Sequence, residues 1–404
     1  MDGRMGMTHK TLALNLLVVA LLLLGAALYL QQAFQSFSYD DEESFAYASW
    51  RVSVGEVPYR DFLSDQMPAF LYWGGLIVRL FGRSYVALRL ATMLVVLLAA
   101  YLFYALNREL YGRPVALLSL ALFLVEANVF HTARFFLSEA PMLFFGVAGL
   151  YAFVLGEKRG KRGYIWLASV LFGLAMLNKL FGALPLAGCY LYLLYAWVRE
   201  RRTLREVLGE GLALGVPALL LVGGVAAVFM RITPYFLTAV FEHHVMQEAE
   251  LSRWQAIVKA LDLYWTYIVS QPVAMGLVVL GGIAVLRRGK ALETLALWQM
   301  PTALVFLTFT RTLMLRHMTY LSPAMTTLAA VALWSLLCGD WRVWEPGAGL
   351  GGQGGPALGL GCSHPGRKPG GRVPLGCGQP GAHTTGRSGL VCSGRFRPEG
   401  DDSR

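Results

Sequence analysis

Long apolar segments recur along most of the chain and are separated by short polar loops. A helix needs about 20 predominantly apolar residues to cross the hydrocarbon core of a bilayer. Segments near that length are found at residues 11–31, 84–106, 114–131, 139–155, 163–179, 181–198, 211–230, 264–286, 292–310 and 318–337. The pattern therefore predicts an all-α polytopic membrane protein with about ten transmembrane helices.

The composition supports this class. Only 15% of the 404 residues are charged and 56% are hydrophobic, which leaves too few charges to cover the surface of a soluble domain. A formal net charge of +10 could indicate a nucleic-acid partner. The basic residues, however, stand in short clusters between apolar segments, where they set membrane orientation, so no nucleic-acid partner is expected.

The basic loops give the expected orientation. Clusters at 107–113, 156–163, 199–206 and 287–290 belong in the cytoplasm together with the N-terminus. The first apolar segment is then a retained signal anchor of a protein in the plasma (inner) membrane. The long loops, above all residues 31–83, face the extracytoplasmic side.

Two short segments of this first outer loop, 31–83, predict interfacial helices. Residues 42–52 carry apolar side chains on one face. Residues 68–82 are apolar but too short to span, and Arg79 interrupts them. A span there would also turn every later basic loop outward. We therefore expect both segments to lie on the outer face.

The chain changes character after residue 337. Residues 338–404 hold 19 of the 44 glycines and 7 of the 17 prolines and show no apolar periodicity. Such a segment buries too little surface to offset its ordering entropy. We expect a transmembrane domain over 1–337 and a disordered tail over 338–404, whose abrupt onset is typical of an out-of-frame gene ending.

The sequence predicts no specific metal site. Five cysteines are present, without CxxC or Cys/His spacing. His243 and His244 follow the seventh predicted span and share the outer face with the acidic cluster at residues 40–43. No cofactor is expected with certainty, and a divalent metal is left open.

Charged side chains of both signs converge on the outer face. Charges at membrane depth are costly and are usually functional. A carboxylate can take a proton from an attacking hydroxyl, and fixed cations can stabilise a departing phosphate, so the set fits group transfer from a lipid phosphate. The residues are Asp41, Glu42, Asp61, Asp65, Arg134, Glu139, Lys179, Arg316 and His317.

Several of these residues also have a structural interpretation. The acidic run that includes Glu42 suits the first turn of an interfacial helix. Arg134 and Glu139 could pair across a turn. Lys179 could reach the lipid headgroups with its long side chain, and Arg316 and Arg311 could anchor the interface.

Several motifs resemble those of the GT-C glycosyltransferases of the protein O-mannosyltransferase and aminoarabinose (lipid A) transferase type. The resemblance covers residues 10 to 337. The first-loop motif DExxYA is matched with Phe45 in the tyrosine place. The matching segments are 41–46 (DEESFA), 55–62 (GEVPYRDF), 67–73 (MPAFLYW), 133–141 (ARFFLSEAP), 177–179 (LNK) and 316–323 (RHMTYLSP).

The resemblance implies a GT-C fold and an inverting glycosyltransferase. Such an enzyme moves a sugar from a polyprenyl-phosphate donor to an acceptor hydroxyl of a protein, lipid or polysaccharide. By that resemblance Asp41 is the catalytic carboxylate and Glu139 a second active-site acid. Arg134, Lys179 and Arg316 are then donor-phosphate residues. The supporting or acceptor-site residues are Glu42, Asp61, Asp65 and His317.

Two other classes of protein stay open. A membrane transporter or lipid flippase would also carry intramembrane charges, but we find no internal repeat of the kind that transporters often show. The third hypothesis is a non-catalytic assembly protein that is related to these enzymes but inactive. The carboxylates retained in the motifs argue against it.

Overall fold

The computed structural model describes residues 2–35, 40–200, 202–242, 252–305 and 315–338. Over these ranges the chain forms helices and turns, and the only β-type contact is an isolated bridge between Pro58 and Phe62. The predicted all-α class is confirmed. The expectations for His243, His244, Arg311 and residues 339–404 lie outside the described ranges.

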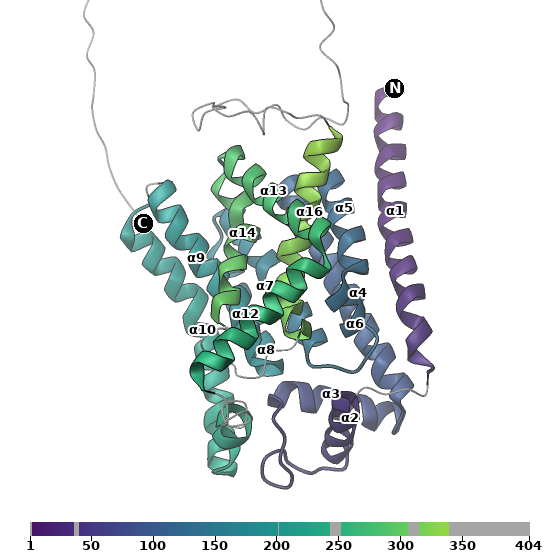
Figure 1. Cartoon of the computed structure of the whole chain (residues 1–404), viewed down its shortest axis with the longest axis vertical. Helices are drawn as coiled ribbons and strands as arrows, with labels where there is room; N and C mark the ends of the chain where they lie inside the picture. The colour runs from purple at the N-terminus through teal and green to yellow at the C-terminus, as the bar shows by residue number, and fades with distance from the viewer. Residues whose placement is uncertain (1, 36–39, 201, 243–251, 306–314, 339–404) are drawn as a thin grey trace, which may run out of the picture. The chain divides into compact units, whose positions relative to one another are not determined.

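The helices follow one another with short connections (Figure 1). The α-helices are α1 Asp2–Ala33, α2 Asp40–Ser53, α3 Pro68–Phe81, α4 Tyr85–Tyr111, α5 Arg113–Val125, α6 Ala127–Thr132, α7 Glu139–Arg159, α8 Arg162–Asn178, α9 Ala183–Arg199, α10 Leu204–Ile232, α12 Arg253–Ser270, α13 Pro272–Arg288, α14 Leu295–Gln299 and α16 Ser322–Leu337. Short turns of other helix types are η1 Leu180–Gly182, η2 Thr238–Glu242, η3 Ala291–Thr294, η4 Met300–Val305 and η5 Leu315–Leu321.

Six helices in the described ranges are long and apolar enough to cross a membrane, or seven if the α12–α13 pair is one bent span. The six are Thr11–Gln31, Tyr85–Tyr111, Glu139–Arg159, Leu180–Arg199, Leu204–Ile232 and Arg316–Leu337. The expected count of ten is therefore not confirmed.

Breaks within apolar segments explain the difference. The predicted span 114–131 divides at Glu126, whose side chain accepts from Val129 N and caps α6 instead of continuing α5. The segment 264–286 is interrupted before Pro272, where α12 and α13 meet at 96°. Apolar length predicts burial in a bilayer, but it does not reveal whether the helix is continuous.

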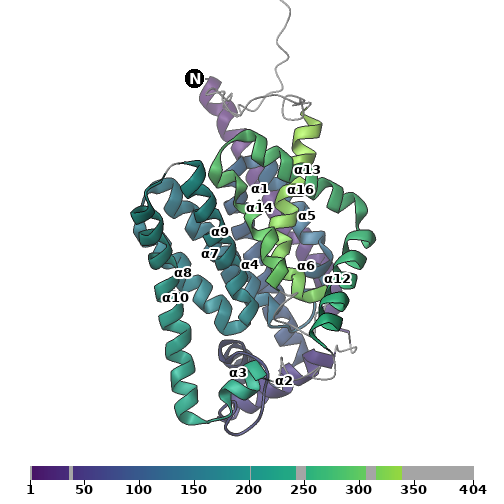
Figure 2. The ribbon, with the colours of Figure 1, turned by 60° about the vertical axis from the view of Figure 1, so that its left-hand side comes forward.

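Helix α7 and the span Arg316–Leu337, which contains most of η5 and all of α16, are the most enclosed of the candidate spans, with 83% and 78% of their apolar windows buried. Helix α7 packs against α8 and α4, and α16 packs against α13 and α5. Figure 2 shows α2 and α3 at the end of this bundle where α4 begins and α8 ends. Contacts of η5 with α6, α7 and η1 bring further chain to the same end.

The two helices expected in the first outer loop are present as α2 and α3, and they pack closely together. Gly74 permits this close packing of α2 and α3, because a Cβ atom at position 74 would lie 2.1 Å from Ser49 Oγ and 2.7 Å from the ring of Phe136. A larger residue at position 74 would force α3 away from α2.

The loop between α2 and α3 is pinned to the end of α10 through Tyr59. This residue has a left-handed backbone (φ 66°), which is uncommon for a side chain of its size. Its buried hydroxyl donates to Gln66 O at 2.5 Å, and Thr233 Oγ1 donates to its carbonyl at 3.2 Å. Its ring packs edge-on against Phe229 and Phe236.

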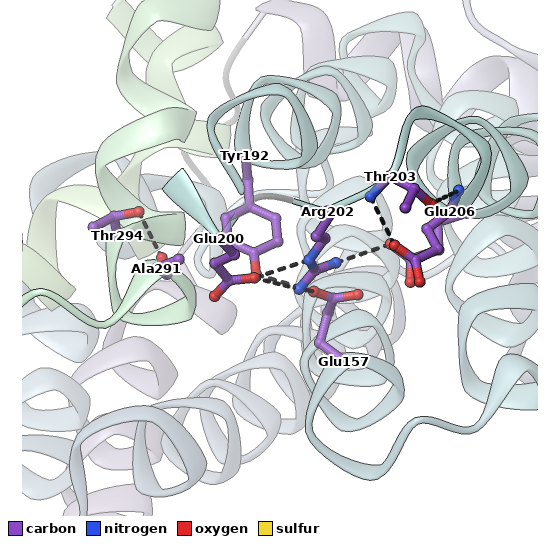
Figure 3. A network of polar contacts seen from close by, with 9 residues as sticks. Glu157, Tyr192, Glu200, Arg202, Thr203, Glu206, Ala291 and Thr294 are labelled. Carbon is purple, nitrogen blue, oxygen red and sulfur yellow. Dashed lines mark hydrogen bonds and ion pairs between the residues drawn. The ribbon is translucent and has the colours of Figure 1, made fainter. Parts of the chain in front are cut away.

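The opposite end of α7 carries a separate ion-pair network (Figure 3). Arg202 donates to Glu157 at 2.9 Å, to Glu200 at 2.8 Å and to Glu210 at 3.0 Å. Tyr192 donates to Glu157 as well. The predicted basic loops 156–163 and 199–206 therefore contact each other on the same side of the bundle. These carboxylates serve packing between α7, α9 and α10.

A buried salt bridge fixes α2 to α4. Arg89 Nε and Nη2 donate to the two oxygens of Glu42 at 2.8 and 2.6 Å, and both side chains are almost fully enclosed. Phe136 N donates to Glu42 at 2.9 Å, and Arg89 Nη1 donates to Gln35 O at 2.7 Å. The pair thus joins four segments of the chain. Its hydrogen bonds offset the cost of removing two charges from water.

We expect Arg89→Met to destabilise the protein by about 3–5 kcal/mol, because it leaves the Glu42 carboxylate buried without its cation. Equilibrium unfolding in mixed detergent micelles measures this. The double variant Glu42→Gln, Arg89→Met should recover part of the loss, whereas Arg60→Met, at an exposed pair with Asp61, should change nothing measurable. An Arg89→Met protein as stable as the unmodified chain would contradict the structural role of this pair.

Candidate active site

Four charged side chains from distant parts of the chain meet at the end of the bundle covered by α2 and α3. Asp41 lies in the first turn of α2, Glu139 is the first residue of α7, Lys179 follows the last residue of α8, and Arg316 lies in η5. The sequence separations among them reach 275 residues (316 minus 41). Helix ends position all four.

Glu139 is the most deeply buried member of this ionic network, with 1% of its side chain exposed. Lys179 Nζ donates to its Oε1 at 2.6 Å, and Arg316 Nε lies 3.6 Å from the same oxygen. Its place in the first turn of α7 adds the favourable field of the helix N-terminus. The buried carboxylate is therefore stabilised from three directions.

Asp41 is the most accessible member. Arg316 Nη2 forms an ion pair with Asp41 Oδ2, and 36% of the Asp41 side chain is exposed, against 11% for Arg316. Arg316 thus bridges the open carboxylate of α2 and the enclosed carboxylate of α7. A reactant that enters from the exposed side meets Asp41 first and the cations behind it.

The network balances two carboxylates with two fixed cations. In this arrangement a carboxylate can accept a proton, and a lysine and an arginine can bind an anion such as phosphate. Because the cations already hold carboxylates, an incoming phosphate would compete with Asp41 and Glu139 for them. The arrangement therefore suits a reaction in which Lys179 and Arg316 exchange part of their contact with the carboxylates for contact with an anionic substrate.

The remaining predicted site residues lie around or outside this network. His317 follows Arg316, and its ring packs against Phe181 at 5.0 Å between centroids. The guanidinium of Arg134 lies over the ring of Phe130 at 4.6 Å. Glu42 contacts Arg89 and holds α2 in place, as shown above.

Asp61 and Asp65 are not joined to the network by any hydrogen bond or ion pair among the described residues. Asp61 accepts from Arg60 and from Val57 N at 2.8 Å, and so shapes the loop. Hydrogen bonds from Arg60, with that from Val57 N, lower the pKa of Asp61 to about 2. So weak a base is poorly suited to take a proton near neutral pH.

Arg89 and Glu126 were not singled out from the sequence. Both are charged residues inside predicted apolar spans, a signal that could have found them. Glu126 is 9% exposed and accepts from Ser322 Oγ at 2.7 Å and from Tyr267 OH at 3.1 Å. These contacts join the start of α6 to α12 and to the start of α16. Ser322, the first residue of α16, follows Arg316 by six residues.

Part of the chain, including two residues of the ionic network, matches a known protein family. Residues 65–224, about two fifths of the chain, match the family described as dolichyl-phosphate-mannose-protein mannosyltransferase. No curated protein sequence matches significantly.

Solved structures share the fold. ArnT from Cupriavidus metallidurans, in the apo state, has a TM-score of 0.63 at 19% identity, over 82% of this chain and 62% of ArnT. The same protein bound to undecaprenyl phosphate gives 0.65 at 20% identity, over 81% and 61%. AglB from Archaeoglobus fulgidus, in complex with an inhibitory peptide and a dolichol-phosphate, gives 0.57 at 14% identity, over 83% and 51%.

The chain thus spans about three fifths of the length of ArnT and about half that of AglB. These likenesses confirm the expected GT-C fold of a multi-pass membrane protein. The family match also falls on the part of the chain that contains Glu139, Lys179 and the connection between α6 and α7.

The 2.6 Å contact between Lys179 and Glu139 gives a testable coupling. In a double-mutant cycle of Lys179→Met and Glu139→Gln, we expect a coupling free energy of about 1.5–3 kcal/mol, the range for a hydrogen bond between charged groups. Equilibrium unfolding in micelles measures it. The exposed Lys161→Met serves as the matched control and should not couple to Glu139→Gln. Additive effects of the Lys179 pair would show that this contact contributes nothing to stability.

Proposed function

We propose that this GT-C-fold membrane protein is a glycosyltransferase that moves a sugar from a polyprenyl-phosphate donor to an acceptor hydroxyl. The observation that carries the proposal is the network in which an accessible carboxylate, Asp41, shares the cation Arg316 with the buried carboxylate Glu139. The structures of ArnT with undecaprenyl phosphate and of AglB with a dolichol-phosphate support the donor class.

The proposed reaction is a single displacement at the anomeric carbon. The acceptor oxygen forms a bond to that carbon while the bond from the carbon to the phosphate oxygen breaks, so the configuration inverts. Asp41 takes the proton of the acceptor hydroxyl as general base. The electron pair of the broken bond leaves on the polyprenyl phosphate, where Arg316 and Lys179 stabilise the added charge.

Donor binding and activation of the base are coupled in this scheme. While Arg316 is paired with Asp41, it occupies a carboxylate oxygen that the acceptor hydroxyl needs as its hydrogen-bond partner. When the donor phosphate engages Arg316, that oxygen is released. Asp41 can then accept a hydrogen bond from the acceptor hydroxyl at the moment when the donor is in place.

Glu139 has a different role from Asp41. With 1% of its side chain exposed and Lys179 at 2.6 Å, it is poorly placed to receive a proton from a bulky acceptor. It instead holds Lys179 and Arg316 in position, and so acts as a positioning carboxylate for the phosphate site. Arg134 is a further donor-site residue in this proposal, and His317, next to Arg316 in the chain, is a supporting residue of the site.

A divalent metal ion stays open as a cofactor of this reaction. Among the described residues, no group of three or more His, Cys, Asp or Glu side chains gathers that could hold one. Lysine and arginine supply the positive charge near Asp41 and Glu139. Transfer assays with and without a chelator test whether a divalent ion contributes.

We propose that the site lies on the extracytoplasmic side of the plasma membrane. The basic loops 156–163 and 199–206 lie at the opposite end of α7 from Glu139. By the positive-inside rule those loops are cytoplasmic. The lipid-linked donor then presents its phosphate at the outer surface, and the acceptor can be a protein, a lipid or a polysaccharide.

We expect Asp41→Asn to lower the rate of sugar transfer by about 10²–10⁴-fold, because the amide cannot act as a base. Donor affinity should stay the same or increase, since Arg316 loses its competing carboxylate. The assay follows release of free polyprenyl phosphate from a panel of polyprenyl-phosphate sugars by purified protein in detergent. Asp65→Asn, the same change at a carboxylate that has no hydrogen bond or ion pair with the network among the described residues, should retain activity.

A folded Asp41→Asn protein with full transfer activity would show that Asp41 is not the base. If the unmodified protein binds these lipids and moves them across the liposome membrane but never cleaves them, the hypothesis of a transporter or flippase is correct instead. The 96° bend between α12 and α13 is the structural feature that would then matter, since broken helices are common in transporters.

Arg316→Lys tests the phosphate site. Lysine keeps the charge but loses the planar set of donors that contacts Asp41 and Glu139 together. We expect the KM for the donor to rise on the order of tenfold, with a smaller change in the KM for the acceptor. Steady-state kinetics with each substrate varied in turn measures both. Equal effects on the two KM values would indicate a general loss of site structure.

A further inference from the structure

A pocket lies on another side of α2, and its lining does not include the ionic network. It encloses about 280 Å³ between α2, the end of α3 and the start of α4. Its lining includes Glu43, Tyr47, Trp50, Arg83, Tyr85 and Leu88. Neither Asp41 nor Arg316 takes part, so this pocket is not the site described above.

The pocket stands at the boundary of a candidate membrane span. Ser84 caps α4 by accepting a hydrogen bond from Ala87 N at 3.3 Å, and the apolar span Tyr85–Tyr111 begins at the next residue. Aromatic side chains such as Tyr47 and Trp50 are typical of the level of lipid headgroups. A molecule in this pocket would therefore contact both the headgroup layer and the apolar surface of α4.

Arg83 presents hydrogen-bond donors to the pocket. Its guanidinium carbon lies 3.7 Å from the centre of the Trp50 ring, a stacked contact that fixes the side chain through its face. The N–H groups lie in the plane of the guanidinium and remain available for an anion. Among the described residues Arg83 forms no ion pair or hydrogen bond. The buried Nε1–H of Trp50 likewise has no acceptor there.

Glu43 adds a negative charge to the same lining. One cation and one carboxylate in a mostly apolar pocket complement a ligand that carries both charges. An anionic lipid without a cationic group would be attracted by Arg83 and repelled by Glu43. The charge pattern therefore favours a zwitterion over a purely anionic lipid.

We propose that this pocket binds the headgroup of a zwitterionic phospholipid. Arg83 holds the phosphate, and Glu43 attracts the ammonium group. The acyl chains extend past Tyr85, which lines the pocket and is 43% exposed, along the start of α4. This site is separate from the proposed donor site and does not depend on transfer activity.

The test measures binding of phosphatidylethanolamine and of phosphatidylglycerol with the same acyl chains to the purified full chain in detergent, by native mass spectrometry. We expect tighter binding of phosphatidylethanolamine. Arg83→Gln should weaken that binding about tenfold, through loss of charged hydrogen bonds to phosphate. Arg79→Gln is the matched control, because Arg79 is an exposed arginine near the end of α3 that does not line the pocket.

Glu43→Gln tests the selectivity independently. It should reduce the preference for phosphatidylethanolamine over phosphatidylglycerol by at least about threefold, since the repulsion of the anionic lipid is removed. This variant decides the matter even if Arg83→Gln fails to fold, which its unfolding curve would reveal.

Two results would overturn the proposal. Equal losses in Arg83→Gln and Arg79→Gln would show that only general surface charge attracts the lipid. Competition between polyprenyl phosphate and phosphatidylethanolamine would show that the pocket belongs to the donor. Because binding is measured without sugar transfer, failure of the glycosyltransferase assay would leave this result unaffected.

Discussion

The site depends on the need to neutralise a carboxylate in an apolar bundle. Glu139 begins the most enclosed of the candidate spans and is almost fully buried. An isolated charge there would be very costly, so cations must come to it. Lys179 reaches it from the end of α8 and Arg316 from η5. The contacts that neutralise Glu139 bring the start of α7, the end of α8 and η5 together. The same two cations are then in position to bind a phosphate.

Helix α2 distributes three successive carboxylates among three environments. Successive helical residues point about 100° apart. Asp41 therefore meets Arg316, Glu42 enters the enclosed contact with Arg89, and Glu43 lines the pocket that contains Arg83. The middle residue anchors the helix. That anchor lets the first residue stand at the edge of the ionic network while it remains accessible.

Much of this could be predicted from sequence, for identifiable reasons. The apolar pattern predicted the all-α class, and amphipathic spacing predicted α2 and α3. The motif residues Asp41, Glu139, Lys179 and Arg316 proved to be neighbours, although their catalytic roles stay predictions. Helix breaks could not be foreseen, because the break at Glu126 depends on hydrogen bonds from α12 and α16. The exclusion of Asp61 from the network depends likewise on its local contact with Arg60.

The charge balance of the network has a consequence for when the base is active. With Asp41 bound to Arg316 and Glu139 bound to Lys179, each charge has a partner before any substrate arrives. The oxygen of Asp41 that contacts Arg316 is not available to an acceptor hydroxyl. A donor phosphate brings a new negative charge that competes for Arg316, and the less buried Asp41 is the carboxylate that can be released into water. A hydroxyl, including that of water, would then be activated chiefly when the donor is bound and the acceptor can occupy the space in front of Asp41.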